Sequence, residues 1–453
     1  MISFIILCIM LNSSLSQPIE LIYADELSGS ASPGAEYRKV SGKVHFQQGN
    51  VVIKCDQANQ YLFANKVELF GNVLITQEDL VLNANRVFYD GNTGVALSDE
   101  KIKIRDKNSV LQAEKGTYST KSFIAEFSQN VTISDDHSII YSDKLVHNRK
   151  TLLSQCFGNV KIEDDSTLVL SDYAEHKAKS KENKSYGKVL AIAKYSNVFL
   201  NCDTLFSFSN DNYAEAIGNP ILCQTDTIEK KKILIENDSL FEFEIDTVFI
   251  SSRSMRGWLK HNQEKFFFKD SVEIAGKRLS GTGKEMIHEK AGQSILLFGN
   301  ARLYYDSTQI HSDSIRIFTI ENKLDSIFCN RNAIMLSKED SSSNRINQIS
   351  GERVWIRFAQ DTIRKVVSDG DAKSLYFLSS EKGDEGAPRL FADRIEILFE
   401  DGEPAIINWL GAIEGEFFPE NIIEEKGADG YYLPNFLWIE SKPQKKQLSR
   451  YLK

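Results

Sequence analysis

A column of acidic side chains recurs along this sequence, and acids at regular spacing could act as general acid and base or could hold calcium. Each follows a small residue, as in Cys55-Asp56 and Ser142-Asp143. The column consists of Asp25, Asp56, Asn85, Glu114, Asp143, Asp172, Asp203, Asp313, Glu352 and Asp393. Its members are spread along the chain instead of gathering at one place, an asparagine interrupts it, and no calcium-binding nonapeptide repeat is present. We therefore expect the column to be structural.

The other side chains that carry chemistry form no motif. The seven histidines include no HExxH zinc motif, and neither a GxSxG nucleophile motif nor a phosphate-binding loop occurs. His147 and His176 hold equivalent positions in neighbouring repeats, where we expect them to face solvent at strand ends. The cysteines lack CxxC spacing, which is typical of small buried apolar side chains: Cys55, Cys156, Cys202, Cys223 and Cys329. The sequence predicts no catalytic residue, no metal site and no cofactor.

The acid column marks an internal repeat of 29 residues. Five units follow one another without a gap: 43–71, 72–100, 101–129, 130–158 and 159–187. A fixed period in this range is the signature of a stacked-repeat architecture. The period loosens further on, where the units are 188–218, 219–257, about 269–299, 300–330, 331–370 and 371–411. The added residues fall in polar stretches such as SKEDSSSNRINQ, which we expect to be loops.

Each unit contains two extended segments. The first alternates apolar and polar residues, as Val73 and Ile75 do in NVLI, and the second follows a polar turn, as in LVLNANRVFYD. Alternation with β-branched residues predicts half-buried strands. The residues expected to line the inner face are Val44, Phe46, Ile53, Val73, Ile75, Leu82, Ile102, Ile104, Leu111, Val131, Ile133, Ile140, Val160, Ile162 and Val169.

Each predicted strand has a corner. In the second strand of a unit, the apolar positions switch to the other face of the strand at the small-acid pair. The first strand of a unit is interrupted at a Gly-Asn pair such as Gly158-Asn159. Such a change marks a bulge or corner, where a short Asp or Asn can hydrogen-bond main-chain donors that the broken ladder leaves unpaired. Hairpins joining two bent strands per unit predict an elongated, all-β antiparallel sheet folded into a trough with apolar inner walls.

Composition and the first residues bear on location and partners. The 453 residues are 42% hydrophobic and 26% charged, as in a folded protein, and a net charge of −9 argues against nucleic acid as a partner. The opening MISFIILCIMLNSSLS predicts an export signal at residues 1–16. No later stretch reaches the roughly 18 apolar residues of a membrane helix. We therefore expect the protein outside the cytoplasm.

The phrases GNVLI, YADEL and YSDKL resemble those of the OstA-like family of periplasmic lipopolysaccharide-transport proteins, in which a G-N-V strand alternates with an A-D-x-aliphatic strand. The resemblance covers about residues 19–411. The matching positions, besides the acid column, are Gly49-Asn50-Val51, Gly71-Asn72-Val73, Gly158-Asn159-Val160, Gly218-Asn219 and Gly299-Asn300-Ala301.

The resemblance implies a β-jellyroll, taco-shaped in section, whose apolar interior shelters the lipid A acyl chains of lipopolysaccharide. It implies the periplasm of a Gram-negative bacterium as the location. It also implies that edge strands pair with other β-jellyroll transport components to bridge the inner and outer membranes, and end-to-end self-association stays open. The chain is much longer than the small single-jellyroll bridge proteins of the family.

Periodicity alone leaves other functions open, namely a structural β-repeat rod or adhesin with a filled core, and a parallel β-helix enzyme acting on polysaccharide. With the resemblance taken into account, we expect a transport protein without enzymatic activity in preference to these two. The predicted segments are a signal peptide at 1–16, an N-terminal strand or cap at 17–42, regular repeats at 43–218, irregular repeats with longer loops at 219–411, and a tail at 412–453 that caps the last repeat or docks a partner.

Overall fold

The structure is a computed structural model. It describes residues 17–29, 37–107, 109–195, 197–235, 238–258, 263–320, 323–338, 345–360, 362–380, 383–400, 402–426 and 430–444. The predicted signal peptide lies outside these residues. The chain divides into two compact units, one up to Asn183 and one from Lys184 onward. The segment boundaries expected from the sequence stay predictions.

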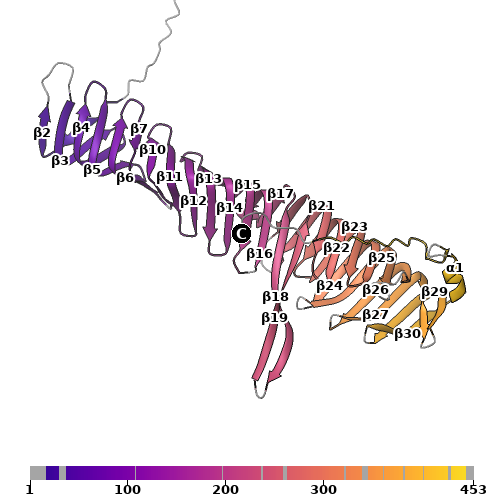
Figure 1. Cartoon of the computed structure of the whole chain (residues 1–453). Helices are drawn as coiled ribbons and strands as arrows, with labels where there is room; N and C mark the ends of the chain where they lie inside the picture. Colours follow the sequence, from indigo (N-terminus) through magenta and orange to yellow (C-terminus); the bar gives the residue numbers. More distant parts are fainter. Residues whose placement is uncertain are drawn as a thin grey trace, which may run out of the picture. The chain divides into compact units, whose positions relative to one another are not determined.

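The first unit is a ladder of antiparallel strands that follow one another in the sequence (Figure 1). For example, β12 pairs with β11 on one side and with β13 on the other. The strands are β1 (Glu20–Tyr23), β2 (Glu26–Gly29), β3 (Tyr37–Gln48), β4 (Val51–Tyr61), β5 (Lys66–Gln77), β6 (Leu80–Asp90), β7 (Val95–Ser98), β8 (Ile102–Asp106), β9 (Ser109–Ala113), β10 (Lys115–Ser119), β11 (Ile124–Ser134), β12 (Ser138–Asn148), β13 (Leu153–Asp164) and β14 (Thr167–Lys177). The division of the chain falls within β15 (Glu182–Ala193).

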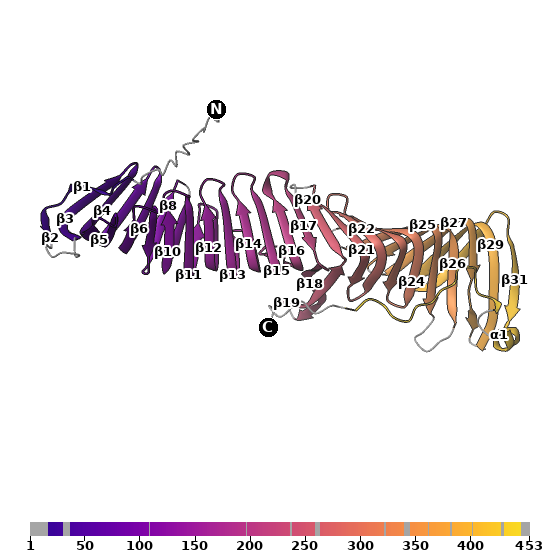
Figure 2. The same cartoon turned by 90° about the horizontal axis from the view of Figure 1, so that it is seen from above.

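The second unit continues with antiparallel strands (Figure 2). Its strands are β16 (Val198–Phe208), β17 (Tyr213–Ile217), β18 (Ile221–Ile235), β19 (Asp238–Ser251), β20 (Ser254–Trp258), β21 (Lys265–Ala275), β22 (Leu279–Glu289), β23 (Ser294–Tyr305), β24 (Thr308–Ile320), β25 (Lys323–Lys338), β26 (Ile346–Ala359), β27 (Thr362–Leu375), β28 (Leu378–Ser380), β29 (Gly383–Glu400), β30 (Glu403–Leu410) and β31 (Glu414–Pro419). The prediction of an all-β antiparallel fold is confirmed.

Helical structure in the described residues is confined to the single turn η1 (Ser209–Asp211) and the short helix α1 (Glu420–Lys426). Within that part of the chain, no helix combines the length and the apolar character needed to cross a membrane. Strand pairing therefore determines the architecture of each unit.

The long strands bend where the register of the ladder shifts. Between β4 and β5 the shift falls between Lys54 and Gln57. The buried side of β4 changes phase at the same place, because Cys55 and Ala58 are both buried although they are three residues apart. The two halves of each strand therefore belong to different walls, and the walls enclose a trough.

The interior of the first unit is one apolar cluster that reaches from Ile19 to Ala174. Both walls contribute to it: Ile53 and Ile75 belong to one wall, while Leu69 and Phe127 belong to the other, and all four are at most 1% exposed. Burying an aliphatic or aromatic side chain of this size contributes about 1.5–3 kcal/mol. Apolar burial between the walls is therefore the main stabilising term of this unit.

The C-terminal residues 430–444, here called the strap, fold back along the second unit. The side-chain amide of Gln309 donates to the carbonyl of Ile439 at 2.7 Å and accepts from its N–H at 3.1 Å. Gln348 accepts from the N–H of Leu433 at 2.9 Å. Two glutamines of the sheet thus hold the main chain of the strap.

The strap also covers apolar residues of that sheet. Phe436 and Trp438 pack against a buried cluster of Ile334, Leu336 and Ile346. Ile334 and Leu336 flank Met335, which lines the interior of the unit, so alternation places the two neighbours on the outer face. Of the two roles expected for the tail, the described part packs on strands of its own chain.

Candidate functional site

The bulges in the strands are formed by pairs of residues in the left-handed conformation. Gly71 has φ +70° and Asn72 has φ +45°, and the two residues lie opposite the single residue Asn85 of β6. Gly158 and Asn159 repeat these values closely, at +72° and +45°. Glycine, followed by asparagine, adopts positive φ with the least strain. The Gly-Asn phrase is therefore the corner of the first strand of a repeat.

The acid column lies over the glycines of these corners. Asn72 donates from Nδ2 to Oδ2 of Asp56 at 2.8 Å, and a β-carbon placed on Gly71 would lie only 2.5 Å from the same oxygen. The carboxylate thus occupies space that only glycine leaves open. The same overlap joins four further pairs: Asp25 with Gly42, Asp143 with Gly158, Asp203 with Gly218, and Asp393 with Gly411.

The rest of the column has varied contacts, and all its members are exposed. Asp313 accepts from Nδ2 of Asn332, and Glu352 lies beside Gly370. Asn85 donates to Glu100, and the N–H of Glu114 donates to the carbonyl of Gln129, while Asp172 lies exposed on β14. The expected bond to a main-chain donor occurs at Asp393, which accepts from the N–H of Ala412 at 3.3 Å. Side-chain amides are the partners at Asp56, Asp143 and Asp313.

No three His, Cys, Asp or Glu side chains in the described part of the chain lie close enough together to hold a metal ion. The acid column in particular is distributed over the corners, one residue to a corner.

Most of the predicted lining residues form one row across the first unit. Each is the direct cross-strand partner of the next, beginning with Phe46 opposite Ile53 and Ile53 opposite Ile75. The complete inner row is Phe46, Ile53, Ile75, Leu82, Ile104, Leu111, Ile133, Ile140, Ile162 and Val169. The remaining predicted residues lie two positions along the same strands, and all of them are buried: Val44, Val73, Ile102, Val131 and Val160.

The exposure of the inner row changes along the unit. From Phe46 to Leu111 its members are at most 3% exposed. Its last four members are half-buried: Ile133, Ile140, Ile162 and Val169. Only the later part of the row can therefore be reached by a ligand without displacing side chains.

Two tyrosines join the two walls where the row is buried. Tyr89 donates from its hydroxyl to Oε1 of Gln48 at 2.6 Å, and Tyr118 donates to Oε1 of Gln77 at 2.9 Å. Each tyrosine lies 41 residues beyond its glutamine and is at most 1% exposed. Burial raises the pKa of both tyrosines, so the hydroxyls stay protonated and act as donors.

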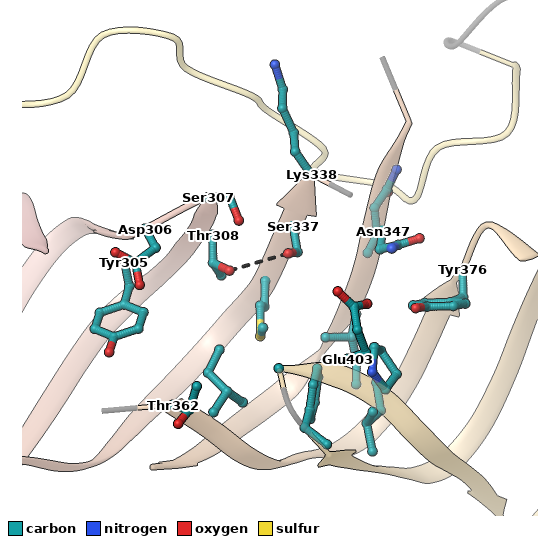
Figure 3. Close-up of a pocket in the computed structure, with 18 of the residues that line it drawn as sticks. Tyr305, Asp306, Ser307, Thr308, Ser337, Lys338, Asn347, Thr362, Tyr376 and Glu403 are labelled. Atoms are coloured by element: carbon teal, nitrogen blue, oxygen red, sulfur yellow. Dashed lines mark hydrogen bonds between the residues drawn. The ribbon is translucent and has the colours of Figure 1, made fainter. Parts of the chain in front are cut away.

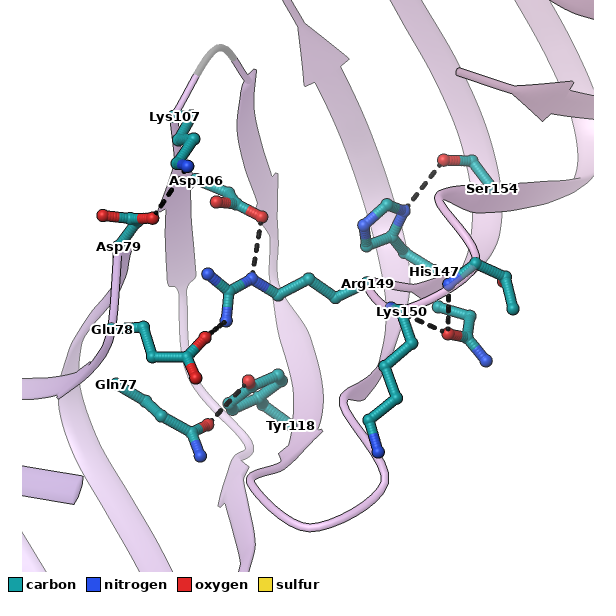
Figure 4. A network of polar contacts seen from close by, with 12 residues as sticks. Gln77, Glu78, Asp79, Asp106, Lys107, Tyr118, His147, Arg149, Lys150 and Ser154 are labelled. Carbon is teal, nitrogen blue, oxygen red and sulfur yellow. Dashed lines mark hydrogen bonds and ion pairs between the residues drawn. The ribbon is translucent and has the colours of Figure 1, made fainter. Parts of the chain in front are cut away.

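An arginine makes the next contact between the edges (Figure 4). Arg149 donates from Nε to Oδ2 of Asp106 at 3.0 Å and from Nη1 to Oε2 of Glu78 at 3.2 Å. Burial alone would lower the pKa of Arg149, but the hydrogen bond and charge of Asp106 outweigh it and the pKa is raised. The guanidinium therefore remains charged between its two carboxylates. We call the contacts of Tyr89, Tyr118 and Arg149 with the opposite edge the clasps.

The histidines at the positions equivalent to these tyrosines do not face solvent, so the prediction that they do is wrong. His147 and His176 are half-buried. His147 is hydrogen-bonded through Nδ1 to Ser154 at 2.9 Å, and burial lowers its pKa, so the ring is neutral. His176 is hydrogen-bonded through Nδ1 to Asn183 at 2.6 Å. Each of these histidines is thus bonded to a residue of the next strand in the chain.

The interior of the second unit contains a cavity of about 250 Å³. Its lining includes apolar side chains: Met335, Ile349, Ile363, Ile397 and Phe399. Figure 3 shows Thr308 and Ser337, hydrogen-bonded at 3.4 Å, on one side of it and Thr362 and Glu403 on another. Apolar and polar side chains thus line the cavity together. Residues of this cavity were not singled out from the sequence, since the repeat is irregular here.

The five cysteines outside the predicted signal peptide are free and buried, which confirms the interpretation drawn from their spacing. Burial raises the pKa of Cys55 and Cys202 to about 12 and that of Cys156 to about 11. These thiols are packing groups, because they are protonated at neutral pH and carry no nucleophilic thiolate.

Fold and site define a class of protein built from antiparallel β-repeats that enclose an apolar trough. Residues 16–129 match the family described as OstA-like protein, so this segment is OstA-like and the resemblance is confirmed there. No curated protein matches the chain.

Among solved structures, the chain is similar to LptH from Pseudomonas aeruginosa, described as the LptA homologous periplasmic component of the conserved lipopolysaccharide transport device. The identity is 13%, and the match covers 32% of this chain and 96% of that one. The TM-score is 0.26, too low to establish a common fold.

Proposed function

We propose that this protein is a periplasmic lipopolysaccharide-transport protein whose trough shelters the acyl chains of lipid A from water. The observation that carries the proposal is the half-buried part of the inner row, Ile133, Ile140, Ile162 and Val169, in which apolar side chains from successive strands form an accessible apolar track. An acyl chain gains about 0.8 kcal/mol for each CH₂ removed from water. Such sheltering needs no catalytic group, so the proposed role is transport and not catalysis.

Two further observations support the proposal. The OstA-like segment at 16–129 is continuous with these strands in the ladder of the first unit. In the second unit, the apolar side chains in the lining of the cavity suit an acyl chain, and the polar ones suit its polar end.

The edges of the two units suit pairing with other β-jellyroll components or with a second copy of the chain. In the described residues, β1 and β2 have β3 as their strand partner and expose Ile22, Tyr23 and Leu27. β30 and β31 pair with β29 and expose Ile406, Leu410 and Phe417. Exposed main-chain groups beside apolar side chains favour addition of a further strand. Through such pairing the protein would take part in a bridge between the inner and outer membranes.

Photocrosslinking in cells tests the proposed function. Benzoylphenylalanine replaces Ile140, which belongs to the inner row, or Tyr141, which is 37% exposed on the opposite face of the same strand. Irradiation should attach lipopolysaccharide at position 140 and leave position 141 at background. Depletion of the protein should stop newly made lipopolysaccharide from reaching the outer membrane. Equal labelling at both positions, or unchanged transport after depletion, would refute the proposal.

A further inference from the structure

The inner row of the first unit changes from fully buried to half-buried between Leu111 and Ile133. Nothing in the apolar sequence of the row accounts for the change, because Ile and Leu occupy it on both sides. We therefore compared how the two edges of the trough meet on either side of the change.

The edges are joined at regular intervals up to the point of change. Gln48, Gln77, Asp106 and Asp135 are spaced 29 residues apart on one edge, and Tyr89, Tyr118, His147 and His176 repeat with the same spacing on the other. The first two pairs are bonded directly, Gln48 to Tyr89 and Gln77 to Tyr118. Each glutamine also donates from Nε2 to a main-chain carbonyl of the opposite turn, Gly91 and Thr120, at 3.0 Å.

At the third pair, the shorter side chain of His147 stands at the position of the tyrosine. His147 does not span the trough, and the bond to Asp106 comes from Arg149 in the turn that follows β12. At the fourth pair both members bond within their own edge: Asp135 accepts from the N–H groups of His137 and Ser138, and His176 is bonded to Asn183. The half-buried residues begin beside this pair, with Ile133 two residues before Asp135.

We propose that the clasps, Tyr89 to Gln48, Tyr118 to Gln77 and Arg149 to Asp106, close the trough over the first three repeats and so confine an acyl chain in the first unit to the inner row from Ile133 to Val169. This inference rests on the proposed function and specifies which part of the first unit takes the lipid. The tyrosine rings fill the closed part, and the histidines leave the later part open. The clasp residues are thus positioning residues that set where the bound chain ends.

The test uses the full-length exported chain and a myristic acid that carries a diazirine near its methyl end. After irradiation, mass spectrometry locates the adducts. Adducts are expected on peptides of β11 to β14 and not on β3 to β6. Adducts on β3 to β6 at a level equal to those on β11 to β14 would overturn the inference, yet leave the proposed function standing. No adducts anywhere in the first unit would refute the proposed function itself.

One variant adds a clasp and another removes one, and a third serves as a comparison for the removal. The double variant Asp135→Gln and His176→Tyr builds the missing fourth clasp and should reduce adducts around Ile133 and Ile140 by about tenfold, the loss expected when roughly two methylenes are denied burial. Tyr118→Ala should bring adducts to Leu82 or Ile104, where the ring no longer fills the trough. Tyr118→Phe keeps the ring but loses the bond to Gln77, so these positions should be labelled less than in Tyr118→Ala and more than in the unaltered protein. Circular dichroism checks that each variant is folded, and unchanged adduct maps in both folded variants would contradict the role of the clasps.

Discussion

The side-chain amide of Asn72 donates to the carboxylate of Asp56 at 2.8 Å, and Gly71, which precedes Asn72, has no β-carbon and so makes room for that carboxylate. The small-acid phrase and the Gly-Asn phrase of neighbouring strands are therefore two halves of one corner. The repetition of both phrases along the chain follows from the repetition of this corner.

The first prediction concerns that corner. Gly71→Ala should lower the free energy of unfolding by about 2 kcal/mol or more, since an L-residue in the left-handed region costs roughly 1–2 kcal/mol and the new methyl group meets Asp56. Asp56→Ala should cost only about 0.5–1 kcal/mol because its bond is exposed. The double variant should lose about 1 kcal/mol less than the sum of the two, as removal of the carboxylate relieves the clash.

Chemical denaturation of the four proteins measures this cycle. Gly29→Ala is the matched control, because a β-carbon at Gly29 would have its nearest neighbour at 3.9 Å. That variant should stay within about 0.5 kcal/mol of the unaltered protein. Strict additivity of Gly71→Ala and Asp56→Ala would show that the two residues do not share the corner.

The second prediction concerns the strap. Trp438 packs on the cluster of Ile334, Leu336 and Ile346, so Trp438→Ala should lower the free energy of unfolding by about 2–3 kcal/mol and increase binding of a hydrophobic dye. Leu437 is 47% exposed, and Leu437→Ala should change stability by less than about 0.5 kcal/mol. Equal effects of the two substitutions would argue that the strap does not cover this face.

The third prediction concerns pH. Burial, followed by the charge of Arg302, lowers the pKa of His311 from 6.5 to about 4. The unfolded chain then binds a proton between these values that the folded chain does not bind, so stability is complete above about pH 6.5 and falls as the pH drops toward 4. Arg302 and Ile334 lie directly opposite His311 on the neighbouring strands, and Gln309 lies on the same face two residues away.

Denaturation between pH 7.5 and 4 compares the unaltered protein with His311→Gln, and these limits bracket the titration of histidine at about pH 6.5. The difference in the free energy of unfolding should shift by roughly 1–3 kcal/mol in favour of the variant as the pH falls, since the glutamine cannot take up a proton. Carboxylate titrations are common to both proteins and cancel. Parallel pH profiles would show that His311 titrates normally in the folded protein.

The fourth prediction concerns the thiols. Cys55, Cys156 and Cys202 are buried with raised pKa values, so a disulfide reagent at pH 8 should react with them about a thousandfold more slowly than with an exposed cysteine. Addition of guanidinium should make all five cysteines outside the predicted signal peptide reactive at once. Fast reaction of any of them in the folded protein would contradict their assignment as packing groups.

The strands and corners could be predicted from the sequence because their signals are local. Alternating apolar residues such as Val73 and Ile75 define a strand within a few positions, and the left-handed pair Gly71-Asn72 is specified by residue type. The regular period then sets the register, since each hairpin repeats the one before it. The irregular repeats of the second unit lack this reinforcement, and its cavity was not foreseen.

The contacts that shape the candidate site could not be predicted, because they join residues far apart in sequence. Gln77 and Tyr118 recur at the period of the repeat and can be found in the sequence. Which tyrosine meets which glutamine across the trough, here one 41 residues away, depends on how sharply the strands bend. Gln309 and Ile439 are 130 residues apart, and the strap carries no repeat. Burial divides the predicted lining residues into closed and accessible parts for the same reason: it depends on the side chains opposite.

Because the long strands β11 to β14 each pair with the strand that precedes them in the chain, this part of the ladder can grow from one end without waiting for later segments. Arrays of this kind are held by contacts between nearest neighbours alone. Duplication of one repeat in the gene would add two strands, about 10 Å at ~4.8 Å per strand, and leave every other interface intact. The span of such a molecule can therefore evolve by recombination in discrete steps.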